Sequence, residues 1–406
     1  MISVIIMDWI EFAVRWLHSI TAIAWIGTSF YFIALDLGLK KHQALPNGVT
    51  GEEWQVHGGG FYQVTKYKGA PDRLPSTLHW FKWEAYLTWV SGVSLLCLVY
   101  YLGSDGTLLP TGSTLSRGVG AGIGLGLLLV GWVAYDQMCK SSLKRAPVLF
   151  ALVGFAGLVA ISYALMLVFT PRAAYLHVGA LIGTCMAANV FFVIIPGQRS
   201  MVDAMTAGDE PDPAHGEAGS LRSLHNNYLT LPVLFIMIST HYPSTYAHPM
   251  NWMILAAVMM IGALTRHWFN LRGKGQNNRW ILPVAAVAFI GLAVLSKPES
   301  SGPGMLAEGE VPVDFYSQVY PIILSRCASC HGTNHPLSPP GPPKGLVWET
   351  AASIKANLKD IERTALIKDA SGNYYMPLGN ITQMTEAERD VIRKWIAQGA
   401  PMGKAK

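Results

Sequence analysis

The chain has 406 residues, of which 51% are hydrophobic and only 14% are charged, whereas an ordinary soluble domain carries roughly 25% charged residues. This composition excludes a disordered chain, which needs low hydrophobicity and high net charge, and it argues against a soluble cytosolic enzyme. The formal net charge of +5 requires no nucleic-acid partner, because the basic cytoplasmic loops of a membrane protein produce the same balance.

Apolar stretches long enough to cross about 30 Å of hydrocarbon, roughly 20 residues each, recur through the first three quarters of the chain. We count eight of them, near residues 8–35, 81–102, 119–138, 147–169, 173–195, 228–244, 250–270 and 280–296. The sixth contains Pro232 and Pro243, so a count of seven is the alternative. The sequence therefore predicts an all-α, polytopic transmembrane bundle of about eight spans over residues 1–296.

The distribution of positive charge orients this bundle, because short cytoplasmic loops accumulate Lys and Arg. Alternate loops carry fourteen basic residues: Lys40, Lys41, Lys66, Lys68, Arg73, Lys82, Lys140, Lys144, Arg145, Arg199, Arg222, Arg272, Lys274 and Arg279. The other loops carry only Arg117 and Arg172. Both termini are therefore expected outside, and acidic Asp8 and Glu11 at the start of the first span argue against a cleaved signal peptide.

Polar residues inside a bilayer are costly, so each is a functional hypothesis. The first span places Asp8, Glu11, Arg15 and His18 on one helical face. Histidines form an outer layer (His18, His177, His241 and His248) and an inner layer (His57, His79, His225 and His267). Two of them could hold a haem b or a metal ion, with His18, His177, His241 and His267 as the candidate redox or relay residues. The alternative is interfacial or hydrogen-bonded histidines.

The first cytoplasmic loop is dense in glycines, aromatics and lysines over His57–Glu84. Three consecutive glycines could bring backbone amides close to a ligand, and the loop composition suits a planar anion. We predict a substrate pocket formed by His57, His79 and His225, with Lys66 or Lys82 balancing the ligand charge. A solvated basic loop that binds anionic membrane lipid is the alternative.

The third span carries a repeated small-residue pattern. Gly118, Gly122 and Gly126 are spaced four apart, with Gly120 and Gly124 offset by two. Small residues four apart let helix backbones approach closely in lipid, so we expect this glycine pattern to serve helix packing and not chemistry.

The composition changes abruptly after Lys297. Residues 297–313 contain the prolines and glycines of a linker, and residues 314–406 form a separate, more charged soluble domain. By the charge distribution, this tail lies on the outer side of the membrane.

The tail contains Cys327-Ala328-Ser329-Cys330-His331, and C-x-x-C-H is the attachment signature of c-type haem. Cys327 and Cys330 would bond the haem covalently, while His331 would be the proximal iron ligand. A thioredoxin-like redox motif and half of a zinc site are the alternatives. The first needs a βαβ pattern that the tail lacks, and the second needs further ligands.

The sixth iron ligand is expected downstream, where the candidates are Met376, Met384 and Met402. The tail resembles a class I cytochrome c domain: an opening helix near 315–326, the haem motif, a proline-rich loop, short helices, a methionine loop and a closing helix. That resemblance favours Met376, which precedes Pro377, as the axial ligand, with Met384 as the fallback.

The whole chain resembles the bacterial membrane-bound urate hydroxylases, also called cytochrome c urate oxidases. The resemblance rests on the His57–Glu84 loop, the His225–Pro232 segment and the fused Cys327-x-x-Cys330-His331 domain. It implies oxidation of urate to 5-hydroxyisourate without hydrogen peroxide, with electrons passing through one covalent haem c to a soluble cytochrome c or a terminal oxidase. It also implies a multi-pass protein of the bacterial cytoplasmic membrane with a periplasmic haem domain.

Two other functions fit the same pattern. The chain could be a quinol-to-cytochrome c electron carrier or a respiratory-complex subunit with a fused haem c domain. It could also be a transporter with a redox-sensing haem domain, although the Pro232 and Pro243 interruption has no counterpart in a second half of the bundle.

Overall fold

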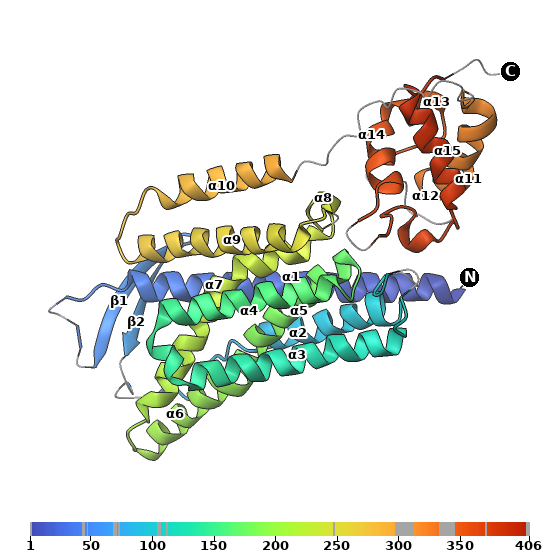
Figure 1. The fold of residues 1–406 in the computed structure, drawn as a ribbon. Helices are drawn as coiled ribbons and strands as arrows, with labels where there is room; N and C mark the ends of the chain where they lie inside the picture. The colour runs from blue at the N-terminus through green and yellow to red at the C-terminus, as the bar shows by residue number, and fades with distance from the viewer. Residues whose placement is uncertain are drawn as a thin grey trace.

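The computed structural model describes residues 2–42, 45–46, 48–67, 71, 74–103, 107–110, 113–246, 248–296, 312–332, 346–369 and 372–402. Most of the expected linker, Lys68, Arg73 and the side chain of Asp8 lie outside the described part of the chain. The fold is mostly helical and has two parts, a long bundle and a smaller helical tail (Figure 1).

The first helix, α1 (Ile2–Gly38), leads into an antiparallel hairpin of β1 (Val49–His57) and β2 (Gly60–Tyr67). The all-α prediction is therefore wrong for this segment, because both strands are rich in the β-branched and aromatic residues that favour extended backbone. Gly58 and Gly59 have φ values of +58° and +80°, as a two-residue type I′ turn requires. Gly58 and Gly59 therefore form the turn of the hairpin, and Gly60 begins β2.

The remaining elements of the bundle are helical. In chain order they are α2 (Trp83–Leu96), η1 (Cys97–Tyr101), α3 (Arg117–Lys140), η2 (Ser142–Arg145), α4 (Pro147–Met166), α5 (Pro171–Ala188), η3 (Asn189–Ile194), α6 (Ile195–Ala207), α7 (Pro213–Ser239), α8 (Pro243–Tyr246), α9 (Asn251–Gly273) and α10 (Ile281–Leu295). α5 is the most buried and packs against α2, α3, α4 and α7. By contrast, large apolar side chains on the outer faces of α1, α3, α4 and α10 are exposed, as expected for surfaces that face lipid.

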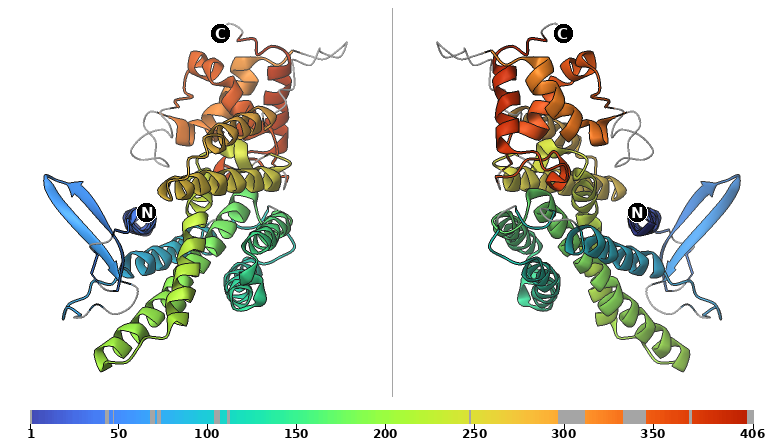
Figure 2. Two further views of the ribbon diagram at one scale, coloured as in Figure 1. Left: turned by 90° about the vertical axis from the view of Figure 1, so that its left-hand side faces the viewer. Right: turned by 90° about the vertical axis from the view of Figure 1, so that its right-hand side faces the viewer.

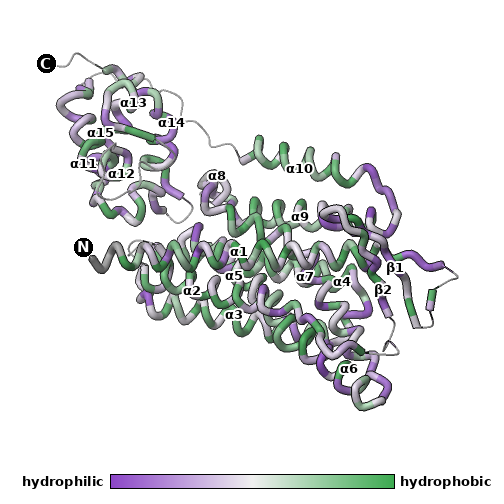
Figure 3. Tube along the Cα trace, turned by 180° about the vertical axis from the view of Figure 1, so that it is seen from behind, coloured by the Kyte–Doolittle hydropathy of each residue, from purple (hydrophilic) through white to green (hydrophobic). Residues whose placement is uncertain are grey.

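Each of the eight predicted spans coincides with a helix, but the described residues contain only five helices long and apolar enough to cross a membrane. These are Trp9–Gly38, Arg117–Lys140, Pro147–Met166, Pro171–Ala207 and Asn251–Gly273. α2 and α10 have only 14 and 15 residues, and α7 begins with a polar half. Figure 3 shows hydrophobic residues along the bundle helices and hydrophilic residues in their connections. A membrane location is thus possible, and the count of eight spans stays a prediction.

Two of the five glycines in the predicted packing pattern of α3 face neighbouring elements, and two others face open space. A methyl group added at Gly122 or Gly126 would meet nothing within 4 Å. At Gly120 it would lie 3.1 Å from Leu108, and at Gly124 it would lie 2.6 Å from Nε2 of His177. α3 therefore approaches its neighbours most closely at Gly120 and Gly124 among these glycines, because these two face the interior of the bundle.

The tail consists of short helices around one apolar core. They are η4 (Phe315–Val319), α11 (Tyr320–Arg326), α12 (Ala328–His331), α13 (Ala351–Ala356), α14 (Leu358–Ile361), η6 (Glu362–Leu366), η7 (Leu378–Asn380) and α15 (Glu386–Ala397). The first and last pack together, with the Phe315 and Trp395 ring centroids 5.1 Å apart. The tail lies beside α8, at the opposite end of the bundle from the β-hairpin (Figures 1 and 2).

Candidate functional site

The Cys327–His331 segment forms one tight turn at the end of α11. The backbone amides of Cys330 and His331 both donate to the carbonyl of Cys327, at 3.0 and 2.8 Å. Cys327 is buried and Cys330 is half-buried. Burial raises the pKa of the Cys327 thiol to about 12 and also raises the pKa of the Cys330 thiol.

The imidazole of His331 is oriented for metal binding through one nitrogen. Its Nδ1 lies 3.0 Å from the carbonyl oxygen of Leu346, a contact that fixes the tautomer with the proton on Nδ1 and leaves Nε2 to act as a ligand. The ring is buried and stacks on Trp348 with centroids 4.0 Å apart. Two thiols one turn apart beside an oriented, buried imidazole are the donor set that a covalent haem c needs.

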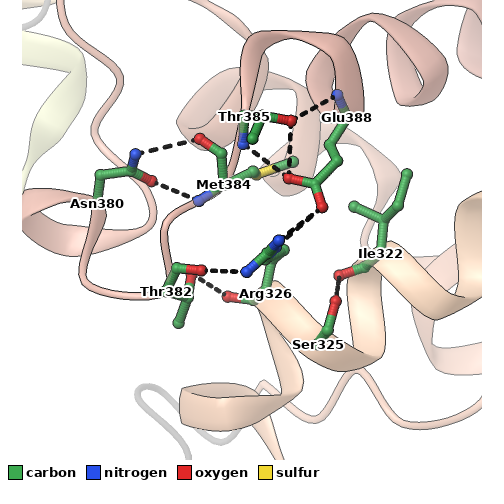
Figure 4. A network of polar contacts seen from close by, with 8 residues as sticks. All are labelled: Ile322, Ser325, Arg326, Asn380, Thr382, Met384, Thr385 and Glu388. Atoms are coloured by element: carbon green, nitrogen blue, oxygen red, sulfur yellow. Dashed lines mark hydrogen bonds and ion pairs between the residues drawn. The ribbon is translucent and has the colours of Figure 1, made fainter.

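The three methionines of the tail have different surroundings. Met384 is 3% exposed and belongs to the core. Asn380 holds its backbone, since the Met384 amide donates to Oδ1 and Nδ2 donates to the Met384 carbonyl, at 2.9 and 3.1 Å (Figure 4). Met376 and Met402 are only half-buried at the edge of that core. Met376 as the iron ligand stays a prediction.

A polar network supports the loop between Met376 and α15. The Arg326 guanidinium, next to Cys327, donates to the Glu388 carboxylate at 2.9 Å and to the Thr382 carbonyl at 2.6 Å (Figure 4). Arg389 donates to the carbonyl of Met376 at 3.0 Å. These bonds fix the methionine loop relative to the Cys327–His331 turn.

The methionine loop also contacts the bundle through the residue before Met376. The ring of Tyr375 packs against that of Tyr246 with centroids 6.1 Å apart. Tyr246, Tyr100 and Tyr375 are electrostatic neighbours of the guanidinium of Arg172. We call these four residues the junction cluster.

The bundle holds a second polar group, which we call the buried network: Asp136, Asn189, Arg222 and Asn226. Arg222 donates to Asp136 at 2.6 Å and to Asn189 at 3.1 Å, and Asn189 donates to Asn226 at 2.8 Å. In the sequence, Arg222 falls among the loop cations. The structure corrects this, because its side chain is buried in an ion pair between α3 and α7.

The five residues predicted for the substrate pocket do not meet. His57 lies exposed at the end of β1, and exposed His79 packs against Phe81. Lys66 pairs with Asp36 at 2.7 Å, and the Lys82 ammonium lies 5.5 Å from the Trp83 ring. His225 lies inside the bundle, with Nδ1 2.9 Å from the Tyr135 hydroxyl. Between described residues, no hydrogen bond, ion pair or ring contact joins any two of the five.

The four candidate relay histidines are also separate. His18 contacts the Thr88 carbonyl at 3.0 Å, and His267 contacts the Tyr228 hydroxyl at 2.6 Å. His177 uses both nitrogens, with Nδ1 2.8 Å from the Ala173 carbonyl and Nε2 3.0 Å from the Tyr101 hydroxyl. His241 is exposed. In the described part of the chain, no group of three His, Cys, Asp or Glu side chains could hold a metal ion.

Sequence reasoning missed the junction cluster and the pairing of Asp136 with Arg222. Asp136 lies within a predicted span, and a charged residue in that position is a signal that it has a buried partner. No local signal marked the junction cluster, because its members come from η1, α5, α8 and the tail.

Comparison with known proteins gives one match. A family model described as urate oxidase N-terminal matches residues 4–297, which is the bundle without the tail. No curated protein and no solved structure matches the chain.

Proposed function

The chain belongs to the urate oxidase N-terminal family, and from this premise we propose that it oxidises urate to 5-hydroxyisourate and passes the electrons through a c-type haem in its tail. The observation that carries the proposal is the union of that family's domain with the Cys327-x-x-Cys330-His331 turn in one polypeptide.

The reaction balances without hydrogen peroxide. Urate and one water give 5-hydroxyisourate, two protons and two electrons. A bound haem c would supply a one-electron acceptor that is reoxidised between the two transfers. The final acceptor would be a soluble cytochrome c or a terminal oxidase of the respiratory chain.

The residues of the tail would hold this group as follows. Cys327 and Cys330 would carry the thioether bonds, and Nε2 of His331 would bind iron while Leu346 fixes the ring through Nδ1. Met376 would be a second iron ligand through its sulfur, with Arg389 donating a hydrogen bond to its backbone carbonyl. The separate surroundings of His18, His177, His241 and His267, with both nitrogens of His177 in contact with other groups, do not fit a haem b or metal ion held between two of them.

The proposed location is the bacterial cytoplasmic membrane, with both termini and the tail on the periplasmic side. Three observations support it: the five long apolar helices, the basic residues on alternate loops, and the periplasmic attachment of c-type haem that the resemblance implies. Anionic lipid would contact the basic loops at the cytoplasmic surface.

A second candidate, quinol oxidation, is favoured by one observation. A groove of about 290 Å³ between α1, α7 and α9 is lined mainly by apolar side chains, with Arg266 and Asn270 as its polar groups. An apolar groove with a few polar groups suits a quinone head and tail.

An experiment on purified membranes separates these functions. Under anaerobic conditions we would add urate, quinol or neither and follow the α-band of the reduced c-type haem. The proposal predicts reduction by urate alone. Reduction by quinol with no response to urate would favour the electron carrier, and no response to either would favour a transporter with a sensing domain.

A further inference from the structure

We propose that the junction cluster (Tyr100, Arg172, Tyr246 and Tyr375) binds the urate anion at the contact between the bundle and the tail. This inference rests on the proposed function and names the site where it takes place. It replaces the pocket that we predicted from His57, His79 and His225, whose side chains do not meet.

Three buried polar atoms of the cluster lack a hydrogen-bond partner in the described part of the chain. They are the Nε of Arg172 and the hydroxyls of Tyr100 and Tyr246, two residues that are each only 3% exposed. A buried donor or acceptor without a partner costs about 1–3 kcal/mol, and more when it is charged. Folded proteins keep such unpaired groups at sites where a bound ligand forms the missing hydrogen bonds. The cluster therefore presents hydrogen-bond donors without partners from three different elements, η1, α5 and α8.

The surrounding elements hold these groups in place. Thr170 caps α5, accepting from the Ala173 amide at 3.3 Å, and its own amide donates to Leu108 at 2.9 Å. Arg172 thus stands in the first turn of α5, where the helix dipole adds positive potential. Tyr100 projects from the π-helical η1, whose widened turn buries both Tyr100 and Tyr101.

The chemistry of the cluster matches a flat anion. The Arg172 guanidinium is a planar fork of donors that suits the adjacent oxygen and nitrogen acceptors of a urate ring. The phenol groups of Tyr100, Tyr246 and Tyr375 add hydroxyls and aromatic faces. Among the described residues, Glu11 is the acidic group that interacts electrostatically with Arg172. Glu11 is itself paired with Arg15, so the Arg172 charge remains available to a ligand.

The position of the cluster also shortens the path of the electrons. Tyr375 belongs to the cluster and is joined directly to Met376, the predicted iron ligand. The hairpin that carries His57 lies at the far end of the bundle (Figure 1). A ligand at the junction would lie beside the tail, and electrons would not have to cross the bilayer.

The test measures binding in the absence of turnover. Full-length holoprotein is reduced with dithionite, so that its haem cannot accept electrons, and the Kd for radiolabelled urate is measured anaerobically. Because a hydrogen bond to a charged group contributes about 1.5–3 kcal/mol, we expect Arg172→Leu to weaken binding by about 10-fold or more. Tyr100→Phe, which removes a neutral hydroxyl, should weaken it by about 3- to 10-fold.

Two further variants make the outcome decisive. Arg172→Lys keeps the positive charge but lacks the planar guanidinium that can donate two parallel hydrogen bonds. Its Kd for urate should therefore lie between those of the wild type and Arg172→Leu. Arg117→Leu removes the other basic residue of the outer loops and should bind urate as the wild type does. The haem spectrum should be the same in all variants, which confirms that the tail is folded.

The results distinguish a wrong site from a wrong function. If the wild-type haem is reduced by urate but Arg172→Leu and Tyr100→Phe bind urate normally, the site is wrong and the function stands. If the wild type neither binds urate nor is reduced by it, the proposed function is wrong. If Arg172→Leu does not fold, Tyr100→Phe and Arg172→Lys decide.

Discussion

The close packing around Gly124 of α3 gives a quantitative prediction for Gly124→Ala. The new methyl carbon would lie 2.6 Å from Nε2 of His177 and nearer still to the Tyr101 hydroxyl, whereas carbon contacts are relaxed at about 3.5–4.0 Å. The neighbours must therefore move by about 1 Å. Such overpacking costs about 1–3 kcal/mol, and breaking the hydrogen bond between Tyr101 and His177 adds about 1 kcal/mol.

Gly122→Ala is the matched control, because a methyl group there meets nothing within 4 Å. Both variants gain the same helix propensity, about 1 kcal/mol, so the difference between them isolates the clash. We expect Gly124→Ala to be about 2–4 kcal/mol less stable than Gly122→Ala. Thermal unfolding in detergent, followed by the reaction of a fluorogenic thiol reagent with buried Cys139 and Cys185, measures this. Equal unfolding temperatures for the two variants would refute the packing that we describe.

Three further predictions concern the tail and the buried network. Met376→Leu should lower the haem midpoint potential and remove the charge-transfer band between methionine and ferric iron. Met384→Leu should keep this band and lower the stability of the tail. The reverse pattern would make Met384 the ligand. Arg222→Met leaves buried Asp136 with Lys140 as its one ionic partner among the described residues, and it should lower the free energy of unfolding by about 3–5 kcal/mol. Adding Asp136→Leu to the same chain should restore most of this loss. A single variant as stable as the wild type would contradict the role of the pair. Burial alone would raise the pKa of the Glu388 carboxyl, but the Thr385 amide and the Arg326 guanidinium outweigh burial and lower it. A lowered pKa stabilises the fold above the unfolded value of about 4.3, and this contribution is lost as the pH falls through the folded value. We therefore expect the wild type to be more stable than Glu388→Gln at pH 7, with the difference disappearing at acidic pH. Unfolding followed by Soret circular dichroism measures this difference. A stability difference independent of pH would show that the carboxylate charge is not its cause.

Features that depend on local sequence were predictable. The Cys327–His331 turn follows from spacing alone, and the capping box of Thr385 and Glu388 at the start of α15 is present. Each predicted span falls on a helix because hydrophobic runs of that length have few other structures available.

Features that depend on distant partners were not predictable. From the sequence alone, Arg222 is a loop cation, and its pairing with Asp136 depends on the packing of α3 against α7. The junction cluster depends on the contact between Tyr375 of the tail and Tyr246 of the bundle. The hairpin was missed because a dense mixture of aromatics, lysines and glycines resembles a binding loop as much as two short strands. Its turn glycines were the signal that could have identified it.

The most direct test of urate oxidation through haem c is an anaerobic titration of the purified, oxidised protein with urate, following haem reduction and 5-hydroxyisourate formation together. We predict that half an equivalent of urate reduces the haem completely and yields the same amount of 5-hydroxyisourate, and that no hydrogen peroxide forms when air and an electron acceptor are restored. Haem that stays oxidised while urate is consumed, or peroxide formed in proportion to urate, would contradict this account.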